Sequence, residues 1–168
     1  MAFNRELIYS TLLTRLQAYL SLTSTPALAQ PISRRARELS TIGPDEQPAC
    51  WLVAGDEQFT QDKGYQPKRT MNAHVLLFVR TDNPDVAPTT IIFPLINLVE
   101  QAIAWQAVPG QVADITPGNY GGMTNLGGLV SHCKLTRVEI VDGLPSGEGM
   151  ALLTIEILAY GNVQGVTG

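Results

Sequence analysis

The chain has 168 residues, of which 45% are hydrophobic and only 15% are charged. This length suits one domain, and the composition is typical of a folded chain rather than a disordered one. The charged share is below the ~25% usual in soluble domains, so we expect uncharged surface that partners can cover. The net charge of −4 supplies no positive excess for phosphates, which argues against a dedicated nucleic-acid-binding protein.

The cysteine content and the N-terminus indicate where the protein is found. The two cysteines, Cys50 and Cys133, are far apart and lie in apolar surroundings, so a disulfide framework is not indicated and a reducing cytoplasm fits best. The first ten residues carry Arg5 and Glu6 and lack the order of a signal peptide. No apolar run approaches the ~18 residues of a membrane span, so we expect no membrane partner.

The first half of the chain predicts one helix and two strands. From Asn4 to Leu20 apolar residues recur every three or four positions, which predicts a helix with Asn4 as its N-cap. The segment that follows has no period and contains prolines, so it reads as an extended connection. A compact apolar block at 49–54 predicts a buried strand, and alternation over 70–79 predicts a second one.

The second half predicts a helix, a long loop and two further strands. Residues 89–103 show helical spacing, whereas 106–128 are rich in glycine and proline and predict a long loop. Two strand-length runs, 129–141 and 149–161, should pair as an antiparallel hairpin. The expected fold is therefore α+β: one domain over 1–168, with two principal helices packed on one face of a mainly antiparallel sheet.

His132 and Cys133 are adjacent, which raises the question of nucleophilic catalysis. Neighbouring residues of a strand point to opposite faces, so His132 is badly placed to activate Cys133. Strict alternation predicts that Cys133 shares one face with Leu135 and Arg137, and that His132 shares the other with Lys134, Thr136 and Val138. A buried cysteine is usually an inert small hydrophobe, so we expect a structural strand here.

The remaining candidates for catalytic or ligand-binding sites also favour structural roles. The two histidines and two cysteines form no ligand pair such as C-x-x-C, and the carboxylate pairs beside turns are typical of solvated loops. The glycine-rich run 118–128 lacks the lysine of a phosphate-binding loop and leads into a strand. Small basic groups at 34–37 and 68–69 are expected to be solvated or to form ion pairs across a subunit boundary. We therefore expect no catalytic, cofactor or metal site, and no enzyme.

Three segments taken together resemble a known family. They are "GPDEQPACWLV" followed by "GDEQF", "TTIIFPLINLVEQAI", and "TNLGGLVSHCKLTRVEI" followed by "ALLTIEIL". In order and spacing they resemble the tail terminator, or tail completion, proteins of tailed bacteriophages over residues 5–160. None of these motifs is catalytic.

This resemblance implies an α+β virion protein that assembles in the host cytoplasm into a ring, six-fold in well-known cases. The ring would cap the head-proximal end of the tail tube, stop its polymerisation and offer a surface for joining the head. The implied partners are further copies of the chain, the tail tube protein and a neck or head-completion protein. DNA would pass through the lumen without specific binding, which the acidic balance suits.

The expected assembly surfaces are two polar segments, 55–68 and 108–125, which read as long and irregular. The candidate interface residues in or next to them are Asp56, Glu57, Gln58, Phe59, Lys68, Arg69, Asp114, Asn119, Tyr120, Met123 and Asn125. The same features suit mobile surface loops. Two other functions stay open: another neck or head-closure subunit, and a small enzyme that uses Cys133 with a histidine from another strand.

Overall fold

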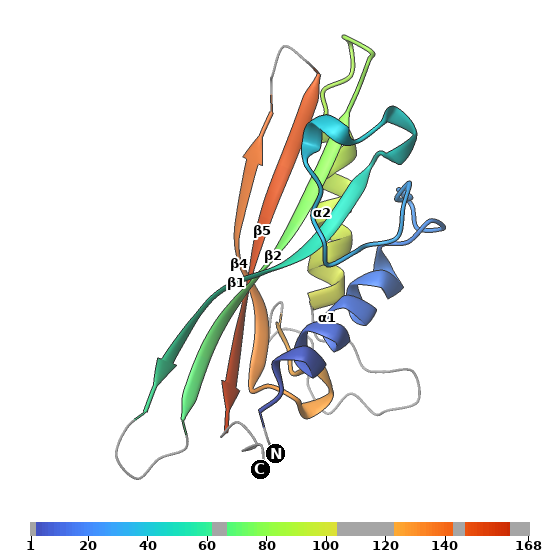
Figure 1. Ribbon diagram of the computed structural model, residues 1–168. Coiled ribbons are helices and arrows are strands. Elements are labelled where there is room, and N and C mark those ends of the chain that lie inside the picture. Colours follow the sequence, from blue (N-terminus) through green and yellow to red (C-terminus); the bar gives the residue numbers. More distant parts are fainter. Residues whose placement is uncertain (1–2, 62–66, 104–122, 143–146, 162–168) are drawn as a thin grey trace.

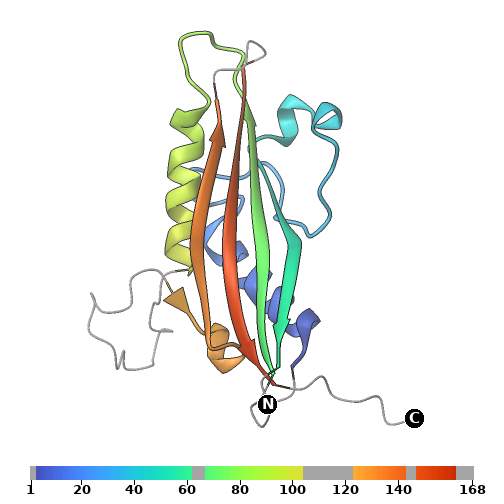
Figure 2. The ribbon, with the colours of Figure 1, turned by 90° about the vertical axis from the view of Figure 1, so that its left-hand side faces the viewer.

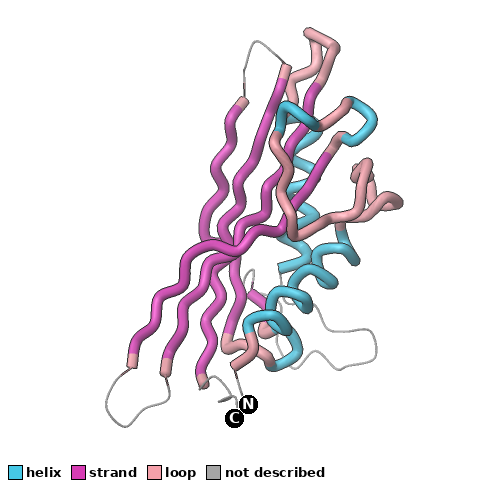
Figure 3. The backbone as a smooth tube through the Cα atoms, in the orientation of Figure 1, coloured by secondary structure: helices cyan, strands magenta, loops and turns pink. Residues whose placement is uncertain are grey.

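The computed structural model describes residues 3–61, 67–103, 123–142 and 147–161 (Figure 1). Its helices and strands are α1 (Arg5–Tyr19), β1 (Ala49–Thr60), β2 (Lys68–Arg80), α2 (Thr89–Ile103), β3 (Met123–Thr124), β4 (His132–Val141) and β5 (Glu148–Tyr160). Short 3-10 helices occur at Leu39–Thr41, Pro44–Glu46 and Leu126–Gly128. Figure 3 shows the two layers, with the strands on one side and the helices on the other.

The strands form a single twisted sheet in the order β1-β2-β5-β4-β3, and each neighbouring pair is antiparallel. Both helices lie against one face, and Figure 2 looks onto the opposite, open face. The α+β prediction with helices on one face of an antiparallel sheet is therefore confirmed.

The helix α1 begins and packs as its sequence predicts. The Asn4 side chain accepts a hydrogen bond from the Leu7 amide at 3.0 Å, which satisfies one of the free N–H groups of the first turn. Ile8, Leu12 and Leu16 are spaced by four residues and are almost completely buried against the sheet and α2. Burial of each such side chain contributes roughly 1.5–3 kcal/mol.

The helix α2 crosses the sheet closely because β5 has a glycine beneath it. A Cβ atom on Gly149 would lie 2.5 Å from Cβ of Pro88 and 3.0 Å from Cδ1 of Ile92. Gly149 therefore lets the start of α2 approach the sheet, and Ile92, Leu95 and Val99 become fully buried. At the far end, Arg15 of α1 donates to the Ala102 carbonyl and joins the two helices.

A β-bulge in β4 overturns part of the predicted face assignment. Leu135 lies opposite Ile155, but Arg137 lies opposite Thr154, so Thr136 is the extra residue. Cys133 and Leu135 share one face, as predicted, and that face is turned toward the helices. Beyond the bulge the faces exchange, so Arg137 is on the open face and Val138, opposite the buried Leu153, is on the helix side. Strict alternation was wrong there because it assumed an uninterrupted pleat.

Two predicted loops are shorter than expected. The strand β1 continues through Thr60 with a register shift between Ala54 and Glu57, so residues 55–60 are strand and not loop. This register shift in β1 is a β-bulge. It breaks the alternation of apolar and polar residues by which a strand is recognised in a sequence. In the predicted loop 106–128, the end forms β3 and a 3-10 helix, while 106–122 lie outside the described residues.

A second, smaller hydrophobic cluster lies on the open face near the start of β1. Trp51 and Phe78 are buried there together with Ala49 and Ile42, the last of which comes from the segment before β1. That segment runs beside β1, because the Leu52 amide donates to the Ser33 carbonyl at 2.9 Å. One corner of the open face is therefore covered by the chain itself.

Candidate functional site

The structure places one half of the candidate interface on paired strands. Phe59 lies opposite Arg69 and Thr60 opposite Lys68, so the residues predicted at 56–59 and 68–69 lie side by side at one end of β1 and β2. They come together through strand pairing, which the loop prediction for 55–68 did not anticipate.

Glu57 is the centre of this group. Its carboxylate accepts bonds from Arg5 at 2.7 and 2.9 Å and from Arg69 Nη1 at 2.8 Å. The bond from Arg5 is the main cause of a lowered pKa for Glu57. The neighbouring Asp56 accepts from the Asn72 amide at 2.8 Å, and this bond lowers the Asp56 pKa. Both carboxylates are thus held ionised within one subunit.

Arg69 lies between two aromatic rings. Its guanidinium carbon is 4.6 Å from the centroid of Phe3 and 4.5 Å from that of Phe59, and its side chain is only 11% exposed. Most of its interactions are therefore made inside the subunit. Gln58, Phe59 and Lys68 remain exposed and can meet a neighbour.

Two residues of the other half of the candidate interface are at the opposite edge of the sheet. Met123 pairs with Lys134 in the short β3–β4 ladder, and Asn125 follows β3 and is exposed. The predicted residues Asp114, Asn119 and Tyr120 lie outside the described part of the chain. The described residues of the two predicted groups are thus separated by the width of the sheet.

Two of the basic residues predicted to be solvated or to pair across subunits, Arg34 and Arg37, find partners in their own chain. Arg34 donates to Glu6 at 2.5 Å, and Arg37 forms a fork with Glu46. The Arg37 bond is the main cause of a lowered pKa for Glu46. These pairs attach the segment before β1 to α1 and to itself.

Sequence reasoning missed a polar cluster on the open face. Glu156 Oε1 lies 3.0 Å from Lys134 Nζ and 3.4 Å from His132 Nε2, and the lysine bond is the main cause of a lowered Glu156 pKa. Alternation placed His132 and Lys134 on one face, but only the β4–β5 register brings Glu156 between them. In the described ranges, no group of three or more His, Cys, Asp and Glu side chains could hold a metal ion.

The cysteines are poorly placed for nucleophilic chemistry. Cys133 is fully buried on the helix-facing side, and burial raises its pKa to about 12. Cys50 is also buried, and its pKa is raised further for the same reason. His132 lies on the opposite face from Cys133, as predicted. A thiolate is the reactive form of cysteine, so neither residue is activated.

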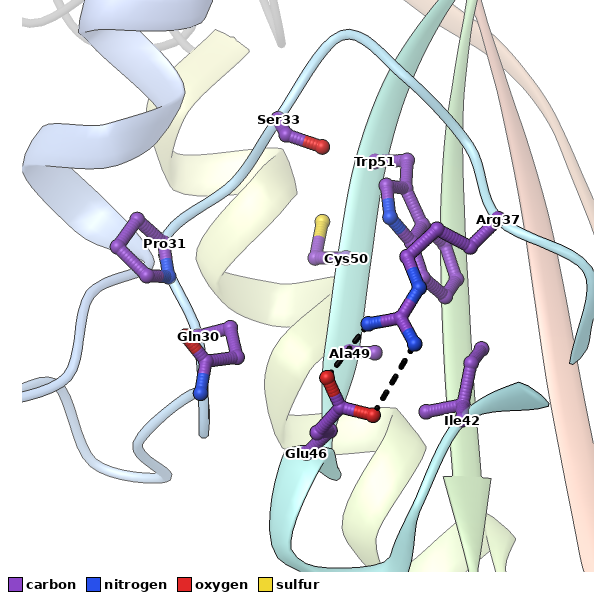
Figure 4. A pocket seen from close by; sticks show the side chains of 9 residues that line it. All are labelled: Gln30, Pro31, Ser33, Arg37, Ile42, Glu46, Ala49, Cys50 and Trp51. Atoms are coloured by element: carbon purple, nitrogen blue, oxygen red, sulfur yellow. Dashed lines mark hydrogen bonds and ion pairs between the residues drawn. The ribbon is translucent and has the colours of Figure 1, made fainter.

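A hollow lies beside β1, between that strand and the segment before it (Figure 4). It has a volume of about 290 Å³ and is lined by Gln30, Pro31, Ser33, Arg37, Ile42, Glu46, Ala49, Cys50 and Trp51. Figure 4 shows the Arg37–Glu46 fork and the indole of Trp51 at the hollow. Below we call this feature the β1 hollow.

Comparisons with known proteins include a distant structural likeness. No protein-family model matches the chain, and no curated protein matches it. A chain in the structure titled "Virion of native gene transfer agent (GTA) particle" is similar, with 10% sequence identity and a TM-score of 0.49. The likeness covers 91% of this chain and 94% of that one. Among the described residues, neither helix is long and apolar enough to cross a membrane.

Proposed function

We propose that this chain is a virion structural protein that forms a ring at the end of a phage tail tube. The ring stops tube polymerisation and provides the surface that joins the tail to the head. The observation that carries this proposal is the sheet's uncovered face, because both helices pack on the other side (Figure 2). The proposal also draws on the sequence resemblance to tail terminators.

The open face has the character of a surface that neighbouring subunits cover. Val53, Leu76 and Met150 pack around the small cluster of Trp51 and Phe78 and are only half-buried. The other end of the same face is polar, with Lys134 and Glu156 forming an ion pair. Apolar side chains at a sheet's second face are usually covered by another layer, so an oligomer would bury this end.

The physical basis of capping is an asymmetry between the two faces of a ring. A ring needs a heterologous contact, in which one patch meets a different patch on the next copy and the rotation closes. If one ring face reproduces the bonding surface of the tail tube protein and the other does not, growth ends after one layer. The second face is then available to a neck or head-completion protein.

The lumen of such a ring would be compatible with DNA passage. The chain carries a net charge of −4, so it has no excess of positive charge with which to hold phosphates. The proposal places the protein in the virion, at the head-proximal end of the tail, after assembly in the bacterial cytoplasm. It takes the six-fold stoichiometry from the family resemblance.

The two alternative functions differ in their support. A cysteine-dependent enzyme needs an accessible thiolate, but both thiols are buried and their pKa values are raised. A different neck or head-closure subunit would use the same kind of surface. Binding to the ends of tail tubes distinguishes a terminator from such a subunit.

The test is to purify the chain, measure its mass in solution and image it together with tail tubes. The expected result is a ring at one end of each tube and tubes that stop growing once the ring is present. A chain that is monomeric in solution but forms a ring at tube ends also supports the proposal. A persistent monomer that neither binds tube ends nor limits tube length contradicts it.

A further inference from the structure

We propose that copies of this chain contact one another head to tail, with Phe93 of one copy inserted into the β1 hollow of the next. The inference rests on the proposed ring-forming function and names one contact of the ring, made at the two edges of the sheet beside the open face. Four observations carry it: an apolar edge at β4, a hollow at β1, their matching level, and the charges beside them.

The first observation is the exposed apolar surface along β4. Val138 and Ile140 lie opposite Leu153 and Ala151, on the helix-facing side, yet they are 36% and 40% exposed. They remain exposed because β4 is almost an edge strand. In the described part of the chain, β3 pairs with β4 only at Cys133 and Lys134.

Phe93 extends this surface from the helix layer. The Thr89 hydroxyl donates to the Asp142 carboxylate at 2.8 Å, which holds the first turn of α2 against the end of β4. Phe93 is four residues after Thr89 and therefore on the same flank of the helix. It is 51% exposed. From the Thr89–Asp142 bond we infer that its ring is on the β4 side of α2, near Val138 and Ile140. We call Phe93, Val138 and Ile140 the apolar edge.

The second observation is the β1 hollow, which suits a side chain better than a metabolite. Its 290 Å³ is just below the roughly 300–1,000 Å³ typical of small-molecule sites. Pro31, Ile42 and Trp51 supply apolar walls, while the charged groups of Arg37 and Glu46 already satisfy each other. An aromatic anchor in an apolar pocket is the usual centre of a stable protein interface.

The third observation is that the apolar edge and the hollow lie at the same level of the sheet. Three cross-strand pairs connect them across the sheet. Ala49 of the hollow pairs with Phe78 of β2, and Phe78 pairs with Met150 of β5. Met150 in turn pairs with Val141 of β4. The two features therefore lie at opposite edges of the sheet and at one height. Copies related by rotation about an axis near the strand direction can bring the edge of one to the hollow of the next without a shift along the strands.

The fourth observation concerns charge. The apolar edge is flanked by the Arg137–Glu139 pair, with 2.7 Å between Nη2 and Oε1, and the hollow holds the Arg37–Glu46 pair. Each of these two pairs contributes one positive and one negative group. The pairs add no net charge to either surface, and they can exchange partners when the copies meet.

The direct test is disulfide cross-linking between two single variants that are mixed before oxidation. One is Phe93→Cys, and the other, which carries a mass tag, is Gln30→Cys at the exposed rim of the hollow. We expect a mixed dimer, both at high protein concentration and on tube ends. Leu7→Cys, on α1 and similarly exposed, replaces Phe93→Cys in the control and should give no such product. The native cysteines are buried.

A second measurement is the self-association of Phe93→Asp. We expect it to be weakened by about tenfold or more, whereas Leu7→Asp changes it less than about twofold. The Tm of each variant shows that it is folded. Two results overturn this inference and leave the proposed function standing. In the first, the wild-type chain forms rings but the Phe93→Cys and Gln30→Cys variants give no mixed dimer. In the second, Phe93→Asp forms rings as well as the wild type does. If the wild-type chain forms no ring and binds no tube end, the proposed function fails.

Discussion

Arg69 Nη1 donates to Glu57 Oε1 over 2.8 Å and couples the start of β2 to β1, while Arg5 approaches the same carboxylate from α1. The arginine side chain is at the same time enclosed by the rings of Phe3 and Phe59. This cluster joins the N-terminal helix to the end of the sheet, so its charges should matter for stability.

Replacing Arg69 by methionine should lower the free energy of unfolding by about 1–3 kcal/mol, because two cation–π contacts are lost and Glu57 loses one of its two partners. Chemical denaturation measures the change. Arg80→Met is the matched control, because the Arg80–Asp82 pair is exposed and spans 3.5 Å; it should cost about 0–0.5 kcal/mol. Equal losses in the two variants would contradict this account.

Acidification should destabilise the fold through Glu57 and Glu156. Both have a folded pKa below the ordinary value of a glutamate. Their contribution to stability is therefore present above the pKa of the unfolded state and is lost as the pH falls through the folded pKa. The free energy of unfolding, measured from pH 7 to pH 3, should decline below about pH 5. Glu57→Gln should be less stable at pH 7 and show a shallower decline. Parallel curves for variant and wild type would refute the assignment to Glu57.

Thiol reagents should not modify the native protein at neutral pH. Cys133 is buried with a pKa of about 12, and Cys50 is buried as well, so thiolate is scarce and shielded. Mass spectrometry should find two labels only after unfolding. Ser131→Cys, at an exposed position next to β4, should add one rapid label in the folded state. Rapid labelling of Cys133 in the folded protein would support the enzyme alternative.

Truncation of Leu16 to alanine should cost about 2–5 kcal/mol, because its side chain is fully buried between α1 and the sheet and its removal leaves a cavity. Leu7→Ala, on the same helix but 47% exposed, should cost less than about 1 kcal/mol. Thermal or denaturant unfolding compares the two. Similar losses would mean that α1 does not pack as described.

Deletion of Thr136 should keep the faces of β4, whereas deletion of Val138 should exchange them. Thr136 is the extra residue, so without it Arg137 still lies on the open face and Val138 on the helix side, and we expect a soluble protein that loses roughly 0.5–3 kcal/mol. Without Val138, Glu139 would turn toward the helices and Ile140 toward the open face, so we expect a loss of several kcal/mol or insoluble protein. Thr136→Ala removes only the 3.1 Å bond to the Thr154 carbonyl and should cost about 0.5–1.5 kcal/mol. Equal losses in the two deletion proteins would contradict the assignment of Thr136 as the bulge residue.

The candidate interface illustrates how far sequence reasoning reached. It selected Asp56 to Phe59 and Lys68–Arg69 as neighbouring polar segments, and the strands do bring them together. It treated them as loop, because the register shift after Ala54 breaks the alternation that marks a strand. The residues of the β1 hollow and the apolar edge were not selected. The hollow depends on how an irregular segment folds back beside β1, and the apolar edge joins α2 to β4, which are far apart in the chain.

The sequence by itself determined the helix faces, the α+β class and the opposite orientation of His132 and Cys133. These depend on periods of 3.6 and 2 residues, which are properties of a continuous stretch of chain. Only the tertiary structure decided the order of the strands and the exchange of faces at Thr136. It also decided the contact of Arg69 with Glu57 and the common level of the apolar edge and the β1 hollow. Register between strands is set by packing against distant residues, and no local pattern records it.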